Sequence, residues 1–247
     1  MFDHVAIRAS DAQASEGFYR TVLAPLGIEP SADAEGFVRW QEFIVSAARE
    51  DRPPTRSVHI GFVARSPEQV DAFWRAGTEG GYADDGAPGE RPQYTPSYYG
   101  AFLRDPGGNS VEAVRHDDTR RGGCVDHLWI GVRDLAASEA FYTTIARHTG
   151  LRPGRRWEHG VQFRGAWATF SLVADGREPS EHLHLAFPAP DAETVQEFHA
   201  AALAAGYRSN GEPGERLQYA PGYYAAFALD PDGNNIESVF RGAAGAA

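Results

Sequence analysis

The chain has 247 residues, with 23 Lys and Arg against 34 Asp and Glu, and a formal net charge of −11 at pH 7. Its content of 42% hydrophobic and 23% charged residues is typical of a folded globular protein and excludes a disordered or fibrous chain. The acidic balance excludes a broad phosphate-binding surface, so we expect no nucleic acid and no anionic membrane as a partner. The single cysteine, Cys124, and the lack of an apolar run of about 20 residues predict a cytoplasmic protein without disulfides or membrane spans.

The first half of the chain predicts one strand, one helix and then further short strands, and this order occurs twice. Residues 4–9 alternate as a strand, and residues 10–27 form a helix that starts at Ser10-Asp11 and stops at Gly27. Short strands follow at 37–41 and 43–48. The order then recurs as a strand at 57–64, a helix at 66–81, and two strands joined by the turn "DPGGN" at 105–109.

The second half of the chain repeats the first. Residues 3–19, "DHVAIRASDAQASEGFY", align with residues 126–142, "DHLWIGVRDLAASEAFY". The segment 89–114 aligns in the same way with 214–239, which carries the turn "DPDGN". A charged, glycine-ended stretch near residues 117–123 is typical of a linker, so we expect two domains, 1–118 and 123–242.

Each predicted β-α-β-β-β module has one helix for one face of its strands, which leaves the other face free to curve around a ligand. Alternation puts His4, Ala6 and Arg8 on one face of the first strand. It likewise separates His59 and Gly61 from the apolar side chains between them. Both histidines are therefore predicted to point into the concave face.

Three segments, "DHVAI", "VHIGF" and "RDPGGNSVEAV", make the chain resemble the vicinal oxygen chelate superfamily of glyoxalases, extradiol dioxygenases, fosfomycin-resistance enzymes and bleomycin-resistance proteins. The resemblance implies an α+β fold, a tandem duplication of glyoxalase-like domains. Each domain would be built from two paired β-α-β-β-β modules that form a curved mixed sheet with helices outside. It also implies one set of metal ligands in each copy: His4, His59 and Glu112 in the first, and His127, His184 and Glu237 in the second. Such a set suits a divalent metal, Fe(II), Mn, Ni or Zn.

The predicted sites depart from two branches of that family. Residues 43–48 and 169–174 offer no further carboxylate of the kind that glyoxalases use, which favours the dioxygenase branch. The ring-cleaving dioxygenases, however, carry a tyrosine where this chain has Phe102 and Phe227, and they carry a histidine earlier that "RPQYTPSYY" lacks. Tyr98 and Tyr223 are then the best candidates for catalytic proton transfer.

Further residues are candidates for substrate binding, each with a structural alternative. Tyr94 and Tyr219 would form a lid, or they would simply line the cavity. Arg91 and Arg216 would hold an anionic group, or they would pair with a neighbouring glutamate at the surface. Phe102 and Phe227 complete the predicted lining. His182 lies on the same strand face as His184 and competes with it as a ligand, although we rank it as a rim residue.

The residues support more than one function. The favoured interpretation is a metal-dependent glyoxalase-like or dioxygenase-like enzyme whose small-molecule substrate chelates the metal through adjacent oxygens. The alternative is a metal-free protein that sequesters a drug, as bleomycin-resistance proteins do. A third interpretation keeps one copy active; its only hint is Trp129, which stands where the first copy has Ala6 and would narrow the second cavity. A homodimer is left open.

Overall fold

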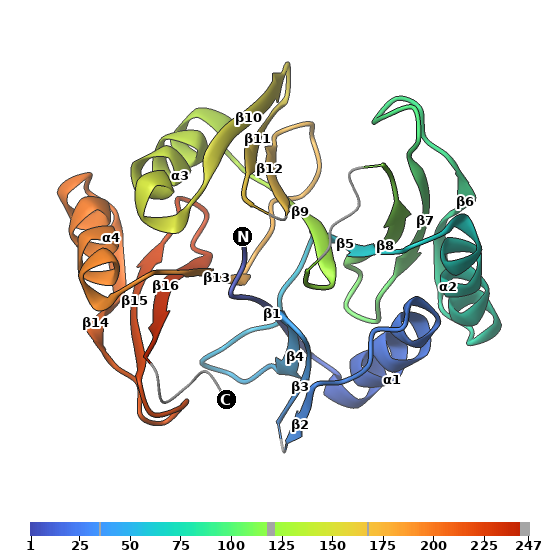
Figure 1. The fold of residues 1–247 in the computed structure, drawn as a ribbon, viewed down its shortest axis with the longest axis horizontal. Coiled ribbons are helices and arrows are strands. Elements are labelled where there is room, and N and C mark those ends of the chain that lie inside the picture. The colour runs from blue at the N-terminus through green and yellow to red at the C-terminus, as the bar shows by residue number, and fades with distance from the viewer. Residues whose placement is uncertain (35, 118–121, 167, 243–247) are drawn as a thin grey trace. The chain divides into compact units, whose positions relative to one another are not determined.

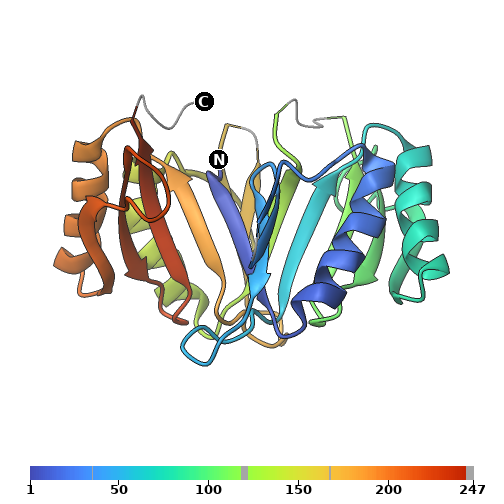
Figure 2. The ribbon, with the colours of Figure 1, turned by 90° about the horizontal axis from the view of Figure 1, so that it is seen from below.

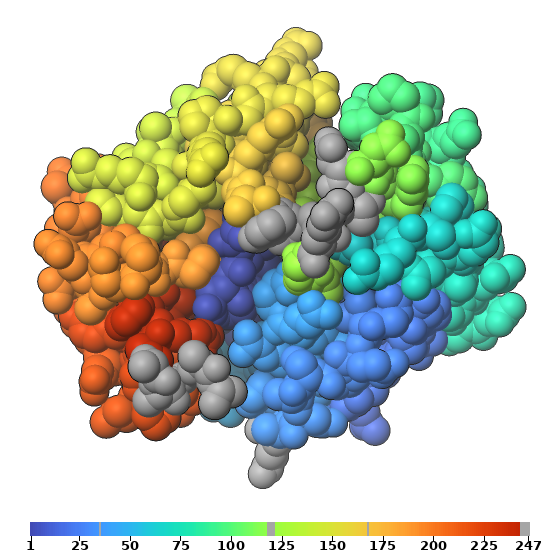
Figure 3. All heavy atoms as spheres, in the orientation of Figure 1, coloured from blue at the N-terminus to red at the C-terminus, as the bar shows by residue number. Residues whose placement is uncertain are grey.

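The computed structural model describes residues 1–34, 36–117, 122–166 and 168–242, so residues 118–121 of the expected linker lie outside the described part (Figure 1). Two compact units divide the chain. Unit 1 consists of Met1–Val5 and Gly131–Ala247, and unit 2 consists of Ala6–Ile130. Unit 1 therefore contains the start of the first repeat's first strand, and unit 2 contains the second repeat's first strand except for Gly131. In Figures 1 and 3 the first residues of the chain, in dark blue, lie beside orange residues of the second half.

The observed elements follow the predicted order and confirm the α+β class. The helices are α1 (Ala12–Leu23), the short 3-10 helix η1 (Ala24–Leu26), α2 (Pro67–Glu79), α3 (Leu135–Thr149) and α4 (Ala192–Ala204). The strands of the first half are β1 (His4–Ala9), β2 (Ala32–Ala34), β3 (Phe37–Trp40), β4 (Phe43–Ala47), β5 (Val58–Val63), β6 (Ala83–Glu90), β7 (Tyr99–Arg104) and β8 (Ser110–Arg115). Those of the second half are β9 (Val125–Gly131), β10 (Arg152–Trp157), β11 (Gly160–Arg164), β12 (Thr169–Val173), β13 (His184–Pro188), β14 (Arg208–Glu215), β15 (Tyr223–Leu229) and β16 (Asn235–Arg241).

Each of these α-helices begins where a short polar side chain accepts a hydrogen bond from the first helical turn. Asp11 accepts from Ala14 N before α1, and Asp134 accepts from Ala137 N at the same place in the second repeat. Ser66 and Asp191 do the same for α2 and α4. Such a cap stabilises a helix by about 1 kcal/mol relative to alanine. The helix starts expected from the sequence are thus present.

The strands of each unit pair in an order that places two histidine strands side by side. Unit 2 contains the order β9-β5-β8-β7-β6, and unit 1 contains β14-β15-β16-β13 with the start of β1 next to β13. β5 runs parallel to β8, and β13 runs parallel to β16, whereas the hairpin partners β7–β8 and β15–β16 are antiparallel. Figure 2 shows α2 packed on one face of the strands of unit 2 and α4 on one face of those of unit 1, so the opposite face of each is the one left for a site.

The repeated turn fixes the register of the parallel strands. In the first repeat, Asn109 Oδ1 accepts a hydrogen bond from Val58 N at the start of β5, and Asp105 accepts from Asn109 N and from the buried hydroxyl of Tyr19. Asn234, Asp230 and Tyr142 make the corresponding bonds in the second repeat, with Leu183 N as the donor. Since these groups are buried, each unmade bond would cost about 1–3 kcal/mol. The turn therefore holds the strand bearing each glutamate level with the strand bearing a histidine.

Among the described residues, the structure has no helix with the length and apolar character needed to span a bilayer.

Candidate metal centres

The six histidines and glutamates predicted as ligands gather into two groups, and each group lies within one unit. The ligand atoms of each group all lie within 4.8 Å of one another. The unit 1 centre consists of His4, His184 and Glu237, and the unit 2 centre consists of His59, Glu112 and His127.

The expected division of the ligands by repeat is wrong. His4 does not join His59 and Glu112 of its own repeat but lies with His184 and Glu237, and His127 takes the place that was assigned to His4. The reason is strand order: β9 is the antiparallel neighbour of β5, on the side away from β8. Asp3 N bonds Ala186 O and anchors the residue before β1 to β13 in the same way. In unit 2 the buried carboxylate of Glu42 accepts from the backbone N–H groups of Cys124 and Val125, at 3.0 and 2.9 Å, and so fixes the entry into β9.

One row of residues across the sheet positions the unit 2 centre. Phe102 of β7 pairs with Glu112 of β8, which pairs with Gly61 of β5, which pairs with His127 of β9. His59 lies two residues before Gly61 and so points to the same face. Gly61 leaves the space that the His127 ring occupies, because a Cβ at this position would lie 2.2 Å from the ring carbon Cε1.

The spacing of the ligand atoms fits a metal ion. In unit 1 the Nε2 atoms of His4 and His184 lie 2.9 Å apart, and Glu237 Oε2 lies 3.5 Å from the first and 3.0 Å from the second. In unit 2 the Nε2 atoms of His59 and His127 lie 3.0 Å apart, and Glu112 Oε2 lies 3.0 and 3.1 Å from them. Two atoms bound at right angles to a metal about 2.1 Å away lie about 3.0 Å apart. Both groups therefore have the geometry of three ligands on one side of an ion.

In unit 1 the outward nitrogen of each histidine has a polar partner. His4 Nδ1 donates to Asp3 Oδ1 at 2.8 Å, and Asp3 also accepts two bonds from Arg241, at 2.9 and 2.7 Å. His184 Nδ1 lies 2.7 Å from the side-chain amide of Asn235, which can present an acceptor by rotating about its last bond. A partner on Nδ1 directs the ring and leaves Nε2 for a metal.

In unit 2 the corresponding partners differ. His127 Nδ1 donates to Asp126 at 3.0 Å, and His116 Nε2 lies 3.1 Å from the same carboxylate. His59 Nδ1 lies 3.0 Å from the hydroxyl of Ser110, which donates in turn to Asp85 at 2.9 Å. Both units have the Asp-His pair, but the aspartate contacts Arg241 in unit 1 and His116 in unit 2.

In the unit 2 centre, contacts between histidines and carboxylates shift the pKa values more strongly than burial does. Burial raises the pKa of Glu112, but the hydrogen bonds from His127 and His59 outweigh that effect and lower the pKa to about 2. Burial lowers the pKa of His127, but the hydrogen bonds to Asp126 and Glu112 raise it to about 10. Against the effect of burial, His116 and His127 hold the pKa of Asp126 well below its ordinary value. The imidazole of His127 thus keeps its proton between two ionised carboxylates, as expected for a site that attracts cations.

The structure brings both predicted tyrosines to the glutamates. The hydroxyl of Tyr98 donates to Glu112 Oε1 at 2.7 Å, and that of Tyr223 donates to Glu237 Oε1 at 2.7 Å. Burial and the adjacent carboxylate raise the pKa of both hydroxyls far above the ordinary value, so the hydroxyls stay protonated. Each glutamate therefore keeps Oε2 for the metal while Oε1 is held by a tyrosine.

The other predicted lining residues lie around the same centres. The rings of Phe102 and Phe227 lie 6.0 and 6.2 Å from those of His59 and His184. Arg91 and Arg216 lie over these phenylalanines and donate to backbone carbonyls of their own segments. Tyr94 and Tyr219 pack on Tyr98 and Tyr223, and Tyr219 is 54% exposed. His182, the competing ligand, has a φ of 59° just before β13 and does not belong to either group.

The structure also corrects which centre Trp129 narrows. Its ring lies 6.1 Å from that of His59 and 6.3 Å from that of His127, so it narrows the centre that contains Glu112 rather than the one that contains Glu237. Tyr94 contacts the same ring at 6.2 Å.

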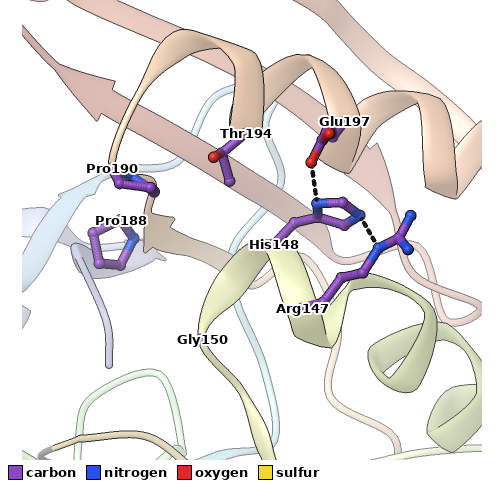
Figure 4. Close-up of a pocket in the computed structure, with 7 residues that line it drawn as sticks. All are labelled: Arg147, His148, Gly150, Pro188, Pro190, Thr194 and Glu197. Carbon is purple, nitrogen blue, oxygen red and sulfur yellow. Dashed lines mark hydrogen bonds and ion pairs between the residues drawn. The ribbon is translucent and has the colours of Figure 1, made fainter.

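A separate pocket of about 440 Å³ lies between the end of α3 and the start of α4, and none of its lining residues is a ligand of either centre (Figure 4). His148 occupies its middle and contacts Arg147 and Glu197.

The sequence reasoning missed the residues that hold the ligands. Asp3 and Asp126 precede the first histidine in each repeat, so the repeated dipeptide Asp-His was the available signal. His116 and Arg241 both lie four residues after the glutamate, but their different side chains hide the correspondence.

Comparisons with known proteins show the family and the fold. The sequence model of the Glyoxalase/Bleomycin resistance protein/Dioxygenase superfamily matches residues 1–113 and 125–238. The uncharacterized protein YqjT of Bacillus subtilis (strain 168) is 27% identical over 122 residues, 46% of this chain and 95% of that protein. The crystal structure of glyoxalase I from Zea mays has a TM-score of 0.71 at 17% identity and covers 97% of this chain and 92% of its own. A putative dioxygenase from Bacillus subtilis subsp. subtilis str. 168 has a TM-score of 0.65 at 14% identity and covers 98% of this chain and 85% of its own.

At such identities the solved structures show a common fold, whereas the sequence match shows descent. Because the match covers both repeats and includes every predicted ligand, the chain belongs to the Glyoxalase/Bleomycin resistance protein/Dioxygenase superfamily, in a tandem form.

Proposed function

We propose that the protein is a metal-dependent enzyme, of the glyoxalase-like or dioxygenase-like kind, acting on a small molecule that binds the metal through two adjacent oxygens. The observation that carries the proposal is the spacing of the ligand atoms. In each unit two Nε2 atoms and one carboxylate oxygen lie 2.9–3.5 Å apart, at the distances that one ion requires. Two imidazoles and one carboxylate also leave coordination positions open for a substrate.

The first histidine of each repeat is held in the orientation that a metal needs. Asp3 and Asp126 accept from Nδ1 of His4 and His127, so Nε2 is the nitrogen directed into the site, where a metal ion would replace any proton that it carries. When bound, a divalent ion would polarise the substrate oxygens and stabilise negative charge that develops on them. The glutamates are 1% exposed, so their charge is little screened by water.

The tyrosines support the centre by positioning the glutamates. A protonated hydroxyl at 2.7 Å holds Oε1 of Glu112 and of Glu237 in place. Because the pKa of Tyr98 and Tyr223 is raised so far, neither hydroxyl is suited to accept a proton as a general base. Proton transfer by these tyrosines remains a prediction.

The aromatic residues favour a small or planar substrate at the unit 2 centre. Trp129 and Phe102 lie beside the His59 ring and Tyr94 packs on Trp129, and such rings contribute apolar contact at low entropy cost. A protein that only sequesters a drug would need these walls but not the buried ligand sets, which is why we favour the enzyme.

Metal analysis followed by a turnover screen tests the proposal. The purified chain is dialysed against chelator and reloaded with Fe(II), Mn, Ni or Zn. Each form is then assayed with catechols in the presence and absence of oxygen, and with thiol adducts of 2-oxoaldehydes. We expect up to two ions per chain and turnover that requires metal. A chain that binds no metal at micromolar concentration would refute the proposal, and Glu112→Gln with Glu237→Gln in one chain is the matched control.

A further inference from the structure

The two centres have the same kinds of ligand, but they differ in the residue that contacts the aspartate of the Asp-His pair. Arg241 occupies this position in unit 1 and His116 occupies it in unit 2, each four residues after the glutamate. We infer that this residue sets the metal affinity of its centre, so that Arg241 weakens divalent metal binding in unit 1 and His116 permits tighter binding in unit 2. The inference rests on the proposed metal binding.

Arg241 is built into the unit 1 centre. Its guanidinium group makes a two-pronged ion pair with Asp3, at 2.9 and 2.7 Å, and lies 4.7 Å from the centre of the Tyr223 ring. Asp3 is the acceptor for His4, and Tyr223 is the donor to Glu237. The hydrogen bond to Asp3 raises the pKa of Arg241 against the effect of its burial, and the charge of Glu237 contributes to the rise. A permanent positive charge therefore acts on the ligands.

His116 makes the corresponding contacts in unit 2. Its Nε2 lies 3.1 and 3.3 Å from the oxygens of Asp126, and its ring stacks on Tyr98 with an interplanar angle of 7° and a centroid distance of 5.8 Å. Asp126 is the acceptor for His127, and Tyr98 is the donor to Glu112. The connections are the same as those of Arg241, but an imidazole, unlike a guanidinium, does not carry a permanent charge.

The other charged groups near the unit 2 ligands do not cancel this difference. Asp85, which accepts from Ser110, is paired with Arg104 at 2.8 Å. In unit 1, Asn210 and Asn235 take the corresponding places and carry no charge. The pair Asp85–Arg104 has no net charge, so it does not change the comparison. In unit 1 the two negative charges of Asp3 and Glu237 are partly neutralised by one guanidinium group. In unit 2, Asp126 and Glu112 face an imidazole.

A change in the outer shell of this size alters metal affinity about 10- to 100-fold. The field that attracts a metal also attracts a competing proton to the imidazole ligands. A divalent ion has twice the charge of a proton, however, so a more negative site still gains affinity for the metal. Removing the guanidinium should therefore tighten binding in unit 1, and adding one should weaken it in unit 2.

Chains with one active centre allow each affinity to be measured alone. Glu112→Gln leaves the unit 1 centre, and Glu237→Gln leaves the unit 2 centre. Co²⁺ binding is measured at pH 8 by titration calorimetry and by the visible absorption of the bound ion. We expect the chain with the unit 2 centre to bind Co²⁺ at least about tenfold more tightly than the chain with the unit 1 centre.

Variants that exchange the residues at positions 241 and 116 test whether the charge of this residue causes the difference in affinity. In the Glu112→Gln chain, Arg241→His should tighten Co²⁺ binding about tenfold, while the control Arg241→Lys, which keeps the charge, should not tighten it. In the Glu237→Gln chain, His116→Arg should weaken binding by a similar factor, with the melting temperature of the metal-free chain as the check on folding.

The failures of the two proposals are distinguishable. If neither single-centre chain binds Co²⁺, the proposed metal-dependent function fails. If both bind it and Arg241→His leaves the affinity unchanged or lowers it, or Arg241→Lys tightens it equally, the inference about charge is overturned.

Discussion

Each centre takes its first histidine from the first strand of the other repeat, and this strand exchange predicts which ligands act on the same ion. His4 Nε2 lies 2.9 Å from His184 Nε2 in unit 1, and no described ligand group joins His4 to Glu112. Removing one of three protein ligands should cost more than the change of an outer-shell partner, so we expect a loss of at least about 100-fold, or about 2.7 kcal/mol, at the affected centre. The other centre should keep its ion.

The number of ions bound by double variants shows which ligands belong to the same centre. His4→Asn, Glu237→Gln and Glu112→Gln should each leave one ion per chain after loading with Zn²⁺ and buffer exchange, counted by native mass spectrometry. His4→Asn with Glu237→Gln should still leave one, because both changes affect the same centre. His4→Asn with Glu112→Gln should leave none. The reverse pattern in the two double variants would refute the strand exchange.

Three more predictions follow from the unit 2 centre. Gly61→Ala should weaken its metal binding, because the new Cβ would meet the His127 ring at 2.2 Å. Calorimetry would show this, and an equal loss in the control Ala186→Gly, which changes the corresponding position of unit 1, would contradict it. Trp129 should lose fluorescence when Cu²⁺ binds, since its ring lies 6.1 Å from one ligand ring; quenching that survives in Glu112→Gln would contradict this. In the metal-free protein, His127 has its pKa raised from 6.5 to about 10, so its contribution to the free energy of unfolding should be complete below pH 6.5 and fade as the pH rises through 10. Chemical denaturation of the wild type and His127→Asn across this range measures it, and a constant difference would count against the buried charge network.

Much of the fold could be predicted because its signals are local. The caps at Asp11 and Asp134, the alternation around His4 and the repeated turn with Asn109 each act within a few residues. Together they predicted the order of elements, whereas the candidate ligands came from the resemblance to a known superfamily. Tyr98, which the sequence offered as a candidate for proton transfer, also lies at the centre, where its hydroxyl donates to Glu112.

The grouping of the ligands could not be predicted from such signals. The first strands of the two repeats have the same pattern, so alternation cannot show whether β5 has β1 or β9 as its neighbour. That choice depends on contacts distant in sequence, such as Glu42 with the backbone of Cys124 and Val125. The role of His116 was hidden for a similar reason, because a polar residue at a strand end has no distinctive period.

The sharing of ligands between the repeats makes the halves of the chain interdependent. A fragment ending at residue 117 keeps His59 and Glu112 but loses His127, and a fragment starting at residue 122 keeps His184 and Glu237 but loses His4. Neither fragment has a complete centre. Two copies of one repeat could complete each other, however, because the first histidine occupies the same place in both sequences. For a single repeat, metal binding would then require self-association and would depend on concentration, and joining two repeats in one chain removes that dependence.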